Sequence, residues 1–210
     1  MSVTQRLLLV LIAATTFATS ASGQAKNELA GIIGRTFISN QGVTDPTFTG
    51  YTVHFGKGLT FEGDYGRHLL GGQGLFGLTL EVPFVFNPDE DLHFIVNQVP
   101  QQYSSYFVTP SARVNFFANT ATSPWVSFGA GFGHFGESSN LEYFGSNPGK
   151  QGTTTSAVQI GVGLDVHAWE KFSVRGEVRD FYSGVPQLNV DTGKSRQHNY
   201  FVGGGVVWHF

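Results

Sequence analysis

Residues 153–167 read TTTSAVQIGVGLDVH, and this stretch decides the fold. Branched aliphatic side chains occupy every second position, namely Val158, Ile160, Val162, Leu164 and Val166. Small, polar or charged residues stand between them, namely Ala157, Gln159, Gly161, Gly163, Asp165 and His167. Because successive side chains of a β-strand point to opposite faces, this alternation predicts a strand with one apolar and one polar face.

The same alternation recurs along the chain after residue 23. It is found in seven further stretches, at residues 28–38, 48–66, 73–86, 103–117, 125–135, 172–179 and 198–210. Clusters of Gly, Pro, Asn, Asp and Ser separate the stretches, and none of them has the period of a helix. We therefore predict an all-β, antiparallel fold of eight strands, in one domain over residues 24–210.

Charged side chains lie opposite the apolar faces of these stretches. They are Glu62, Asp64, Glu81, Arg113, Asp165, Arg175, Glu177 and Arg179. The first stretch is ambiguous, because placing Arg35 with these charges also places Ile33 and Phe37 on the charged side. A soluble sandwich would bury the apolar faces, whereas a transmembrane barrel would turn them to lipid and enclose the charges. Periodicity alone does not separate these two folds.

Strand and loop lengths favour the barrel. Several stretches exceed the roughly 5–6 residues of a typical strand, and a tilted membrane strand needs about 9–11. Short connections at 66–72, 118–123 and 167–171 alternate with long ones at 39–47, 87–102, 137–152 and 183–197. This pattern is typical of outer-membrane barrels, with short periplasmic turns and longer extracellular loops. The sequence therefore predicts a closed antiparallel transmembrane β-barrel.

Composition and aromatic placement support the same fold. Only 13% of the residues are charged, while 28 are glycine and 20 are phenylalanine; a soluble domain carries about 25% charged residues. Aromatic belts are predicted at the two interfaces. Trp125, Trp169 and Trp208 are assigned to the short-turn end, and Tyr51, Tyr103, Tyr106, Tyr182 and Tyr200 to the long-loop end.

The first 23 residues predict export. Arg6 precedes an apolar run from Leu7 to Ala14 and a small, weakly polar segment ending at Gly23, which is the layout of a secretory signal peptide. The chain has no cysteine, which excludes disulfides, thiol chemistry and lipid attachment at a cysteine. A net charge of −3 argues against nucleic acid as a partner.

Residues 200–210, YFVGGGVVWHF, resemble the closing strand of bacterial outer-membrane β-barrels. The alternating residues that carry the resemblance are Tyr200, Val202, Val206, Trp208 and Phe210. The mature chain is similar to the small outer-membrane-protein β-barrel domain family, the OmpA/OmpX/OmpW-like class. The resemblance implies location in the outer membrane, lipids as partners and recognition of this strand by the barrel-assembly machinery, and we expect a monomer. Pro110 departs from the pattern and predicts a bulge or local break.

The enclosed charges, Arg35 included, allow two interpretations: a polar conduit or catalytic pair, or a salt-bridge network. Eight strands leave an interior just wide enough for side chains to fill, and buried charges are costly unless paired. We therefore predict an ionic network that seals the lumen. The glycine runs 129–133 and 203–205 resemble nucleotide-binding loops only superficially, because no helix follows them.

Metal and cofactor binding are not predicted. The seven histidines are scattered and form no HxxxH or HxH pair, so metal ligands would have to converge from different strands. They are His54, His68, His93, His134, His167, His198 and His209.

The loop 87–102 combines acids with an apolar segment. Asp89, Glu90 and Asp91 lack the spacing of a calcium loop and are interpreted as solvated charges. The apolar residues after them are Leu92, Phe94, Ile95, Val96 and Val99. They predict ordered structure: an extended hairpin, a cover over the mouth, or a contact with a surface ligand.

Three functions remain open from the sequence. The leading hypothesis is a non-enzymatic protein with a role in envelope structure or surface interaction. The second is a narrow passage for small hydrophobic molecules, which resemblance to OmpW-like barrels implies. The third is an enzyme that modifies lipid A through His134, Glu137 and Ser138.

Overall fold

The computed structural model describes residues 26–70, 75–118 and 120–210. The predicted signal peptide lies outside the described residues. Within the described part no helix is long and apolar enough to cross a membrane.

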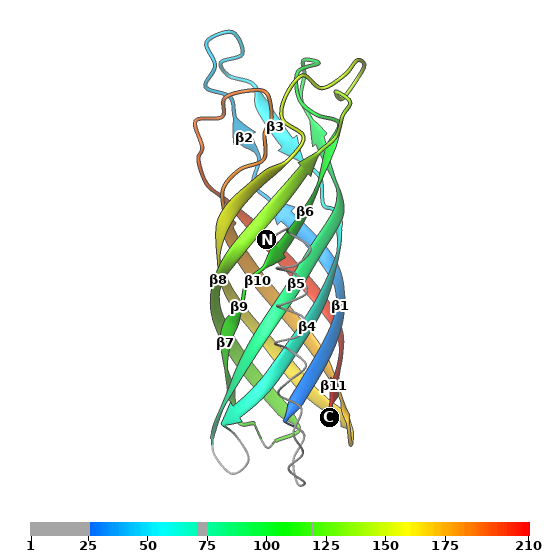
Figure 1. The fold of residues 1–210 in the computed structure, drawn as a ribbon, viewed down its shortest axis with the longest axis vertical. Helices are drawn as coiled ribbons and strands as arrows, with labels where there is room; N and C mark the ends of the chain where they lie inside the picture. The colour runs from blue at the N-terminus through cyan, green and yellow to red at the C-terminus, as the bar shows by residue number, and fades with distance from the viewer. Residues whose placement is uncertain (1–25, 71–74, 119) are drawn as a thin grey trace, which may run out of the picture.

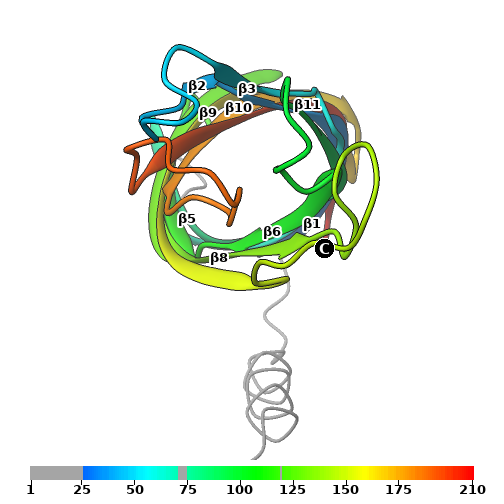
Figure 2. The ribbon, with the colours of Figure 1, turned by 90° about the horizontal axis from the view of Figure 1, so that it is seen from above.

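The chain forms a closed, eight-stranded antiparallel barrel (Figures 1 and 2), which confirms the predicted fold class. Closure follows from the pairing of β1 with both β4 and β11. The wall consists of β1 (Asn27–Ile38), β4 (Leu59–Leu70), β5 (Phe76–His93), β6 (Gln102–Val108) with β7 (Ser111–Phe116), β8 (Thr122–Glu137), β9 (Thr153–Trp169), β10 (Phe172–Ser183) and β11 (Gln197–His209). Two short strands, β2 (Gln41–Gly42) and β3 (Thr52–Phe55), extend one side above the wall.

β6 and β7 occupy one position in the wall, since both pair with β5 and β8. The ladder is interrupted at Thr109 and Pro110, because proline has no N–H to donate. Val108 lies opposite Phe84 and Ser111 opposite Glu81, so the register is the same on both sides of the interruption. The predicted local break is confirmed, and it occurs without a bulge.

Apolar side chains cover the outside of the wall, as the alternation predicts. The most exposed of them on the strands include Phe76, Phe128, Ile160, Val174 and Val206. Arginine and carboxylate side chains are buried inside, and the arginines at positions 113, 175 and 179 have no exposed surface. This apolar exterior around a charged interior is the arrangement of a transmembrane barrel.

The predicted strand over 48–66 is wrong in its first half. β3 and β4 are separate strands, joined by Gly56, Lys57 and Gly58. Val53 is fully buried and Phe55 half-buried, whereas the continuous alternation placed both on the outer face. The regular ladder is interrupted at the linker, because the Gly58 N–H donates to the side-chain Oε2 of Glu90 at 3.0 Å and not to a backbone oxygen. The alternation changes phase across this interruption.

The first half of the predicted loop 87–102 is strand. β5 continues to His93, and Glu90 pairs with Tyr103 in an extended hairpin with β6. The shorter connection 94–101 then turns over the interior, as Figure 2 shows for the mouth of the barrel. Leu92, Phe94 and Val99 are buried. The expected ordered structure is present, as both a longer hairpin and a cover over the mouth.

Candidate functional site

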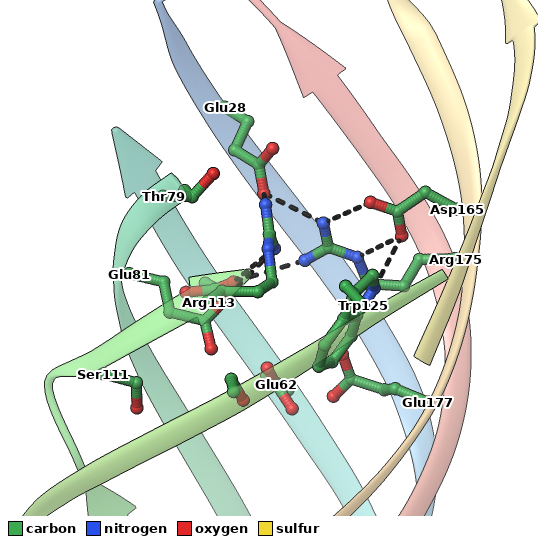
Figure 3. A network of polar contacts seen from close by, with 12 residues as sticks. Glu28, Glu62, Thr79, Glu81, Ser111, Arg113, Trp125, Asp165, Arg175 and Glu177 are labelled. Atoms are coloured by element: carbon green, nitrogen blue, oxygen red, sulfur yellow. Dashed lines mark hydrogen bonds and ion pairs between the residues drawn. The ribbon is translucent and has the colours of Figure 1, made fainter. Parts of the chain in front are cut away.

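Three arginines from two regions of the wall meet in the lumen around Trp125. Figure 3 shows two of them, Arg113 and Arg175. Arg113 comes from β7, and Arg175 and Arg179 come from β10, where Glu177 stands between them on the same inward face. Because residues two apart on a strand share a face, this segment brings two cations and one anion to the interior together.

Arg113 and Arg175 share one carboxylate. Arg113 Nη2 lies 2.6 Å and Arg175 Nη2 2.9 Å from Glu28 Oε1. Arg113 also donates to Glu81 Oε2 at 3.1 Å. Arg175 holds Asp165 through two bonds, from Nε at 2.7 Å and from Nη2 at 2.8 Å. The paired geometry of the guanidinium matches the two oxygens of a carboxylate and fixes both side chains.

Arg179 binds a second set of acids. Its Nε lies 2.8 Å from Glu177 Oε1 and 3.2 Å from Glu62 Oε1, and its Nη1 lies 2.8 Å from Glu81 Oε1. Glu81 therefore bridges Arg113 and Arg179, and Asp64 lies 3.3 Å from Nη1 of Arg175. All three arginines belong to one connected ionic network.

Carboxylates outnumber arginines in this network among the described residues. The six acids are Glu28, Glu62, Asp64, Glu81, Asp165 and Glu177. Both carboxylate oxygens of Glu62 and Oδ1 of Asp64 accept no hydrogen bond. Six carboxyl groups therefore surround three guanidinium groups, and each arginine contacts several acids at once.

Trp125 lies inside the barrel, so its prediction as part of an interfacial belt is wrong. Its side chain is 1% exposed, and the guanidinium carbons of Arg113, Arg175 and Arg179 lie 5.5, 5.3 and 5.2 Å from its ring. Its Nε1–H donates to Asp165 Oδ1 at 3.1 Å. Cations near an aromatic ring and a satisfied indole N–H make this burial favourable.

The sequence itself indicates that Trp125 faces inward. Trp125 has the same parity as Ser127 and Gly129, which belong to the inner face of β8. On the neighbouring strand Gly163 leaves the space that the indole fills, since a Cβ there would overlap the ring.

Arg35 lies outside the lumen, which corrects its assignment to the ionic network. It is exposed and donates to the backbone oxygen of Lys57 at 2.7 Å. Ile33 also faces outward, at 53% exposure. The register explains this: Ile32 lies opposite Glu62 and Ala30 opposite Asp64, and directly opposed residues share a face. Glu28 is the inward charge of β1, which sequence reasoning missed.

The other predicted belt residues divide between the outside and the inside. Trp169 and Trp208 are exposed at the short-turn ends of β9 and β11, and Tyr182 and Tyr200 are exposed nearer the long-loop ends of β10 and β11. Tyr106 is partly exposed on β6, and Tyr51 is exposed in the loop between β2 and β3.

The prediction of Tyr103 as part of the same belt is wrong, because its side chain is 1% exposed and lies inside the barrel. Its ring packs edge-on against Phe135, with 5.7 Å between the ring centroids.

An apolar cluster fills the barrel above the ionic network. Phe107 stacks on Phe181 with ring centroids 4.8 Å apart, and Phe107 also contacts Phe135. Residues of the loops and of the upper strand ends complete the cluster. Val43, Phe94, Val99 and Leu188 come from loops, Val53 from β3 and Leu92 from the end of β5. The lumen is thus occupied by charged side chains in one half and by apolar side chains in the other.

The candidate lipid-modifying residues do not form a catalytic group. His134 Nδ1 is hydrogen-bonded to Thr154 Oγ1 at 2.8 Å, and Glu137 Oε1 accepts the N–H of Gln187 at 2.7 Å. Ser138 Oγ accepts the N–H of Asn140 at 3.1 Å. Nucleophilic catalysis needs the nucleophile and the base within hydrogen-bond reach of one another. These hydrogen bonds join each of the three side chains to another residue and not to one another.

Three of the histidines converge, contrary to the expectation that they are scattered. His68 on β4, His167 on β9 and His209 on β11 meet at the short-turn end, beside Glu28. The ring centroids of His68 and His209 are 6.2 Å apart, and those of His167 and His209 are 6.4 Å apart. Strand pairing brings them together, so no local sequence motif marks them.

A closed eight-stranded wall with an apolar exterior and an ionic lumen defines a small transmembrane β-barrel. The chain belongs to the outer membrane protein beta-barrel domain family, whose model matches residues 7–210. No curated protein matches it.

Solved structures that resemble the chain are also outer-membrane barrels. Neisserial surface protein A is 12% identical, with 90% of this chain and 100% of that chain covered and a TM-score of 0.55. OprG of Pseudomonas aeruginosa is 12% identical, with 91% and 100% covered and a TM-score of 0.52. The N-terminal barrel of OprF from the same organism is 16% identical, with 90% and 100% covered and a TM-score of 0.50. At these identities the likeness establishes the fold alone.

The proposed assembly signal lies on the outer face of the last strand. Tyr200, Val202, Val206, Trp208 and Phe210 are all exposed there. Their recognition by the assembly machinery stays a prediction.

Proposed function

We propose that the protein is a non-enzymatic, non-conducting outer-membrane barrel that presents a rigid interaction surface outside the cell. The observation that carries the first half is the filled lumen. The network of Arg113, Arg175 and Arg179 with Trp125 crosses one half, and the apolar cluster of loop and wall residues fills the other. Because side chains occupy both halves of the lumen, we expect no continuous column of water through it.

Membership of the family supports an orientation with the short turns in the periplasm and the long loops outside. Neisserial surface protein A, one of the similar structures, is by its name a surface protein. We infer a surface role for this chain from its loops, because they are held together by specific bonds.

The side chain of Asn97 joins two of these loops. Its Nδ2 donates to the backbone oxygen of Phe144 at 2.7 Å, and its Oδ1 accepts the N–H of Tyr143 at 3.0 Å. The Tyr143 hydroxyl donates to the oxygen of Phe94 at 2.8 Å. The connection 94–101 is therefore fixed to the β8–β9 loop, and a surface fixed before binding loses less entropy when a partner binds.

Exposed apolar side chains gather on this fixed surface. Tyr51, Ile95, Tyr143 and Phe144 are exposed, and all but Phe144 line a hollow of about 450 Å³ beside His54 and His93. Apolar groups exposed on an ordered surface mark a contact site for a partner. We propose that the surface ligand binds here.

Conductance across a planar lipid bilayer tests the closed lumen. The purified, folded barrel should give no current steps above the background of the empty bilayer. Stable current steps that grow with salt concentration would contradict the proposal. The control is the same protein after heat denaturation, because OprF, at 16% identity, is too different in sequence to serve as a reference.

A second candidate function, a passage for small hydrophobic molecules, is favoured by the interruption of the wall at Thr109 and Pro110 beside the apolar cluster. The rate at which vesicles containing the barrel take up a fluorescent apolar probe distinguishes a sealed barrel from a passage for hydrophobic molecules. A filled interior predicts the same rate as protein-free vesicles. A faster rate, abolished by Pro110→Val, would favour the passage.

A further inference from the structure

The short-turn end contains a hollow of about 460 Å³ with histidines from several strands at its wall. Glu28, His68 and His209 each direct one ligand atom to a common point, with these atoms all within 4.8 Å of one another. Oε2 of Glu28 lies 3.1 Å from Nε2 of His68 and 3.9 Å from Nδ1 of His209. Two imidazoles therefore face the same carboxylate oxygen.

That carboxylate oxygen accepts no hydrogen bond, although Glu28 is 1% exposed. The other oxygen, Oε1, is occupied by Arg113 and Arg175. Oε2 is thus a buried anionic atom, directed at the hollow and not used by the arginine network.

Hydroxyl groups hold the far side of each imidazole. His68 Nδ1 is 2.9 Å from Thr79 Oγ1, and this hydroxyl donates its hydrogen to Asn115 Oδ1 at 3.4 Å. The hydroxyl must then accept from His68 Nδ1–H, which leaves the lone pair of Nε2 facing Glu28 Oε2 in the neutral ring. A cation between His68 Nε2 and Glu28 Oε2, either a proton on the ring or a metal ion, accounts for their separation of 3.1 Å.

His209 is held in the same manner. Its Nε2 is 2.9 Å from Ser173 Oγ, so its Nδ1 faces the carboxylate. A ligand histidine whose second nitrogen is hydrogen-bonded is the usual arrangement around a protein metal ion, since that bond fixes the tautomer and the ring direction.

We propose that Glu28, His68 and His209 bind a divalent transition-metal ion, Zn²⁺ foremost, at the periplasmic mouth of the barrel. Two imidazole nitrogens and one carboxylate oxygen suit Zn²⁺ better than Ca²⁺ or Mg²⁺, which prefer oxygen ligands alone. Bond lengths of about 2.0–2.2 Å need only small movements of these side chains. The fourth position faces the hollow and is filled by water. Through Glu28, the ion is joined directly to the arginine network of the lumen.

Zinc titration of the folded, metal-stripped barrel in detergent, followed by calorimetry, tests the site. One Zn²⁺ should bind per barrel, and excess Ca²⁺ should not displace it. His68→Gln and His209→Gln should each weaken binding at least ten-fold. His198→Gln should leave it unchanged, because His198 pairs with a single acid, Asp180, near the other end.

Two further measurements keep the test decisive. Thr79→Val leaves all three proposed ligands in place but removes the hydrogen bonds of the Thr79 hydroxyl to His68 and Asn115. It should weaken zinc binding roughly 10–100-fold, and the difference in gel migration between heated and unheated samples verifies that each variant is folded. Co²⁺ in place of Zn²⁺ should give the strong visible absorption of a four-coordinate ion in the wild type and in His198→Gln, but not in His68→Gln or His209→Gln. Failure of the wild type to bind one Zn²⁺, or unchanged affinity in both histidine variants, would overturn the proposal.

Discussion

Each arginine of the lumen is the cation for several carboxylates at once. Arg175 contacts Asp165, Glu28 and Asp64, so its loss would leave three buried acids without that partner. Arg35, by contrast, is an exposed side chain whose hydrogen bond goes to a backbone oxygen. The charge of Arg175 should therefore contribute far more to the stability of the barrel than that of Arg35, although both lie in strands with the same apolar and polar alternation.

Replacing Arg175 by methionine should lower the free energy of unfolding by about 3–5 kcal/mol, because breaking a buried ion pair strands the remaining charges. Arg35→Met is the matched control and should have no measurable effect. Urea unfolding in detergent micelles, followed by tryptophan fluorescence, measures both. Equal losses in the two variants would contradict the separation of Arg35 from the network.

At the scale of the element, the β5–β6 hairpin is the structure that closes the mouth. Its wall portion continues the barrel ladder, and its connection 94–101 returns over the apolar cluster. Leu92 is buried beneath that connection, whereas Ile95 is exposed on it. Burial of Leu92 therefore holds the connection in place.

Leu92→Asp should release the connection, because an unpaired charge in an apolar cluster is strongly unfavourable. We expect protease cleavage of intact cells within 94–101 to accelerate by about ten-fold or more, since cleavage follows the population of the open form. Ile95→Asp carries the same charge on the exposed side and should be cleaved at the wild-type rate. Slow cleavage of both variants would show that the cluster does not hold the connection.

In the whole molecule, apolar side chains cover the outside of the wall and charged side chains are buried inside, the reverse of a water-soluble protein. Phe128 illustrates the exterior: it lies on β8, faces outward and is 61% exposed. In water this exterior would cause aggregation, whereas in a bilayer it contacts acyl chains. Stability of the barrel therefore depends on its surroundings as much as on its own contacts.

Phe128→Arg should lower the free energy of unfolding from lipid vesicles by about 2–4 kcal/mol, because Phe128 lies near the middle of β8 and pairs with Ile160 near the middle of β9. Phe144→Arg places the same charge on an exposed loop residue and should cost little. A larger loss at Phe144 than at Phe128 would contradict the placement of the wall in lipid.

The alternation in residues 153–167 and its repeats determined the strands and their two faces, because side-chain direction in a strand follows from the backbone. The closed barrel with its apolar face outward was predicted from the strand and loop lengths and the low share of charged residues. The inward positions of Glu62, Asp64, Glu81, Asp165 and the three arginines followed from the same parity. The break at Pro110 also followed, since it depends on a missing donor in one residue.

Tertiary structure alone decided what depends on contacts between strands. The pairing of β1 with β4 turned Glu28 inward and Arg35 outward, and the Gly56–Gly58 linker reversed the phase of Val53. Trp125 had the parity of an inner residue, but its partners came from β7, β9 and β10. His68 and His209 are far apart in the chain and meet only because the barrel closes, so no local pattern could have placed them beside Glu28.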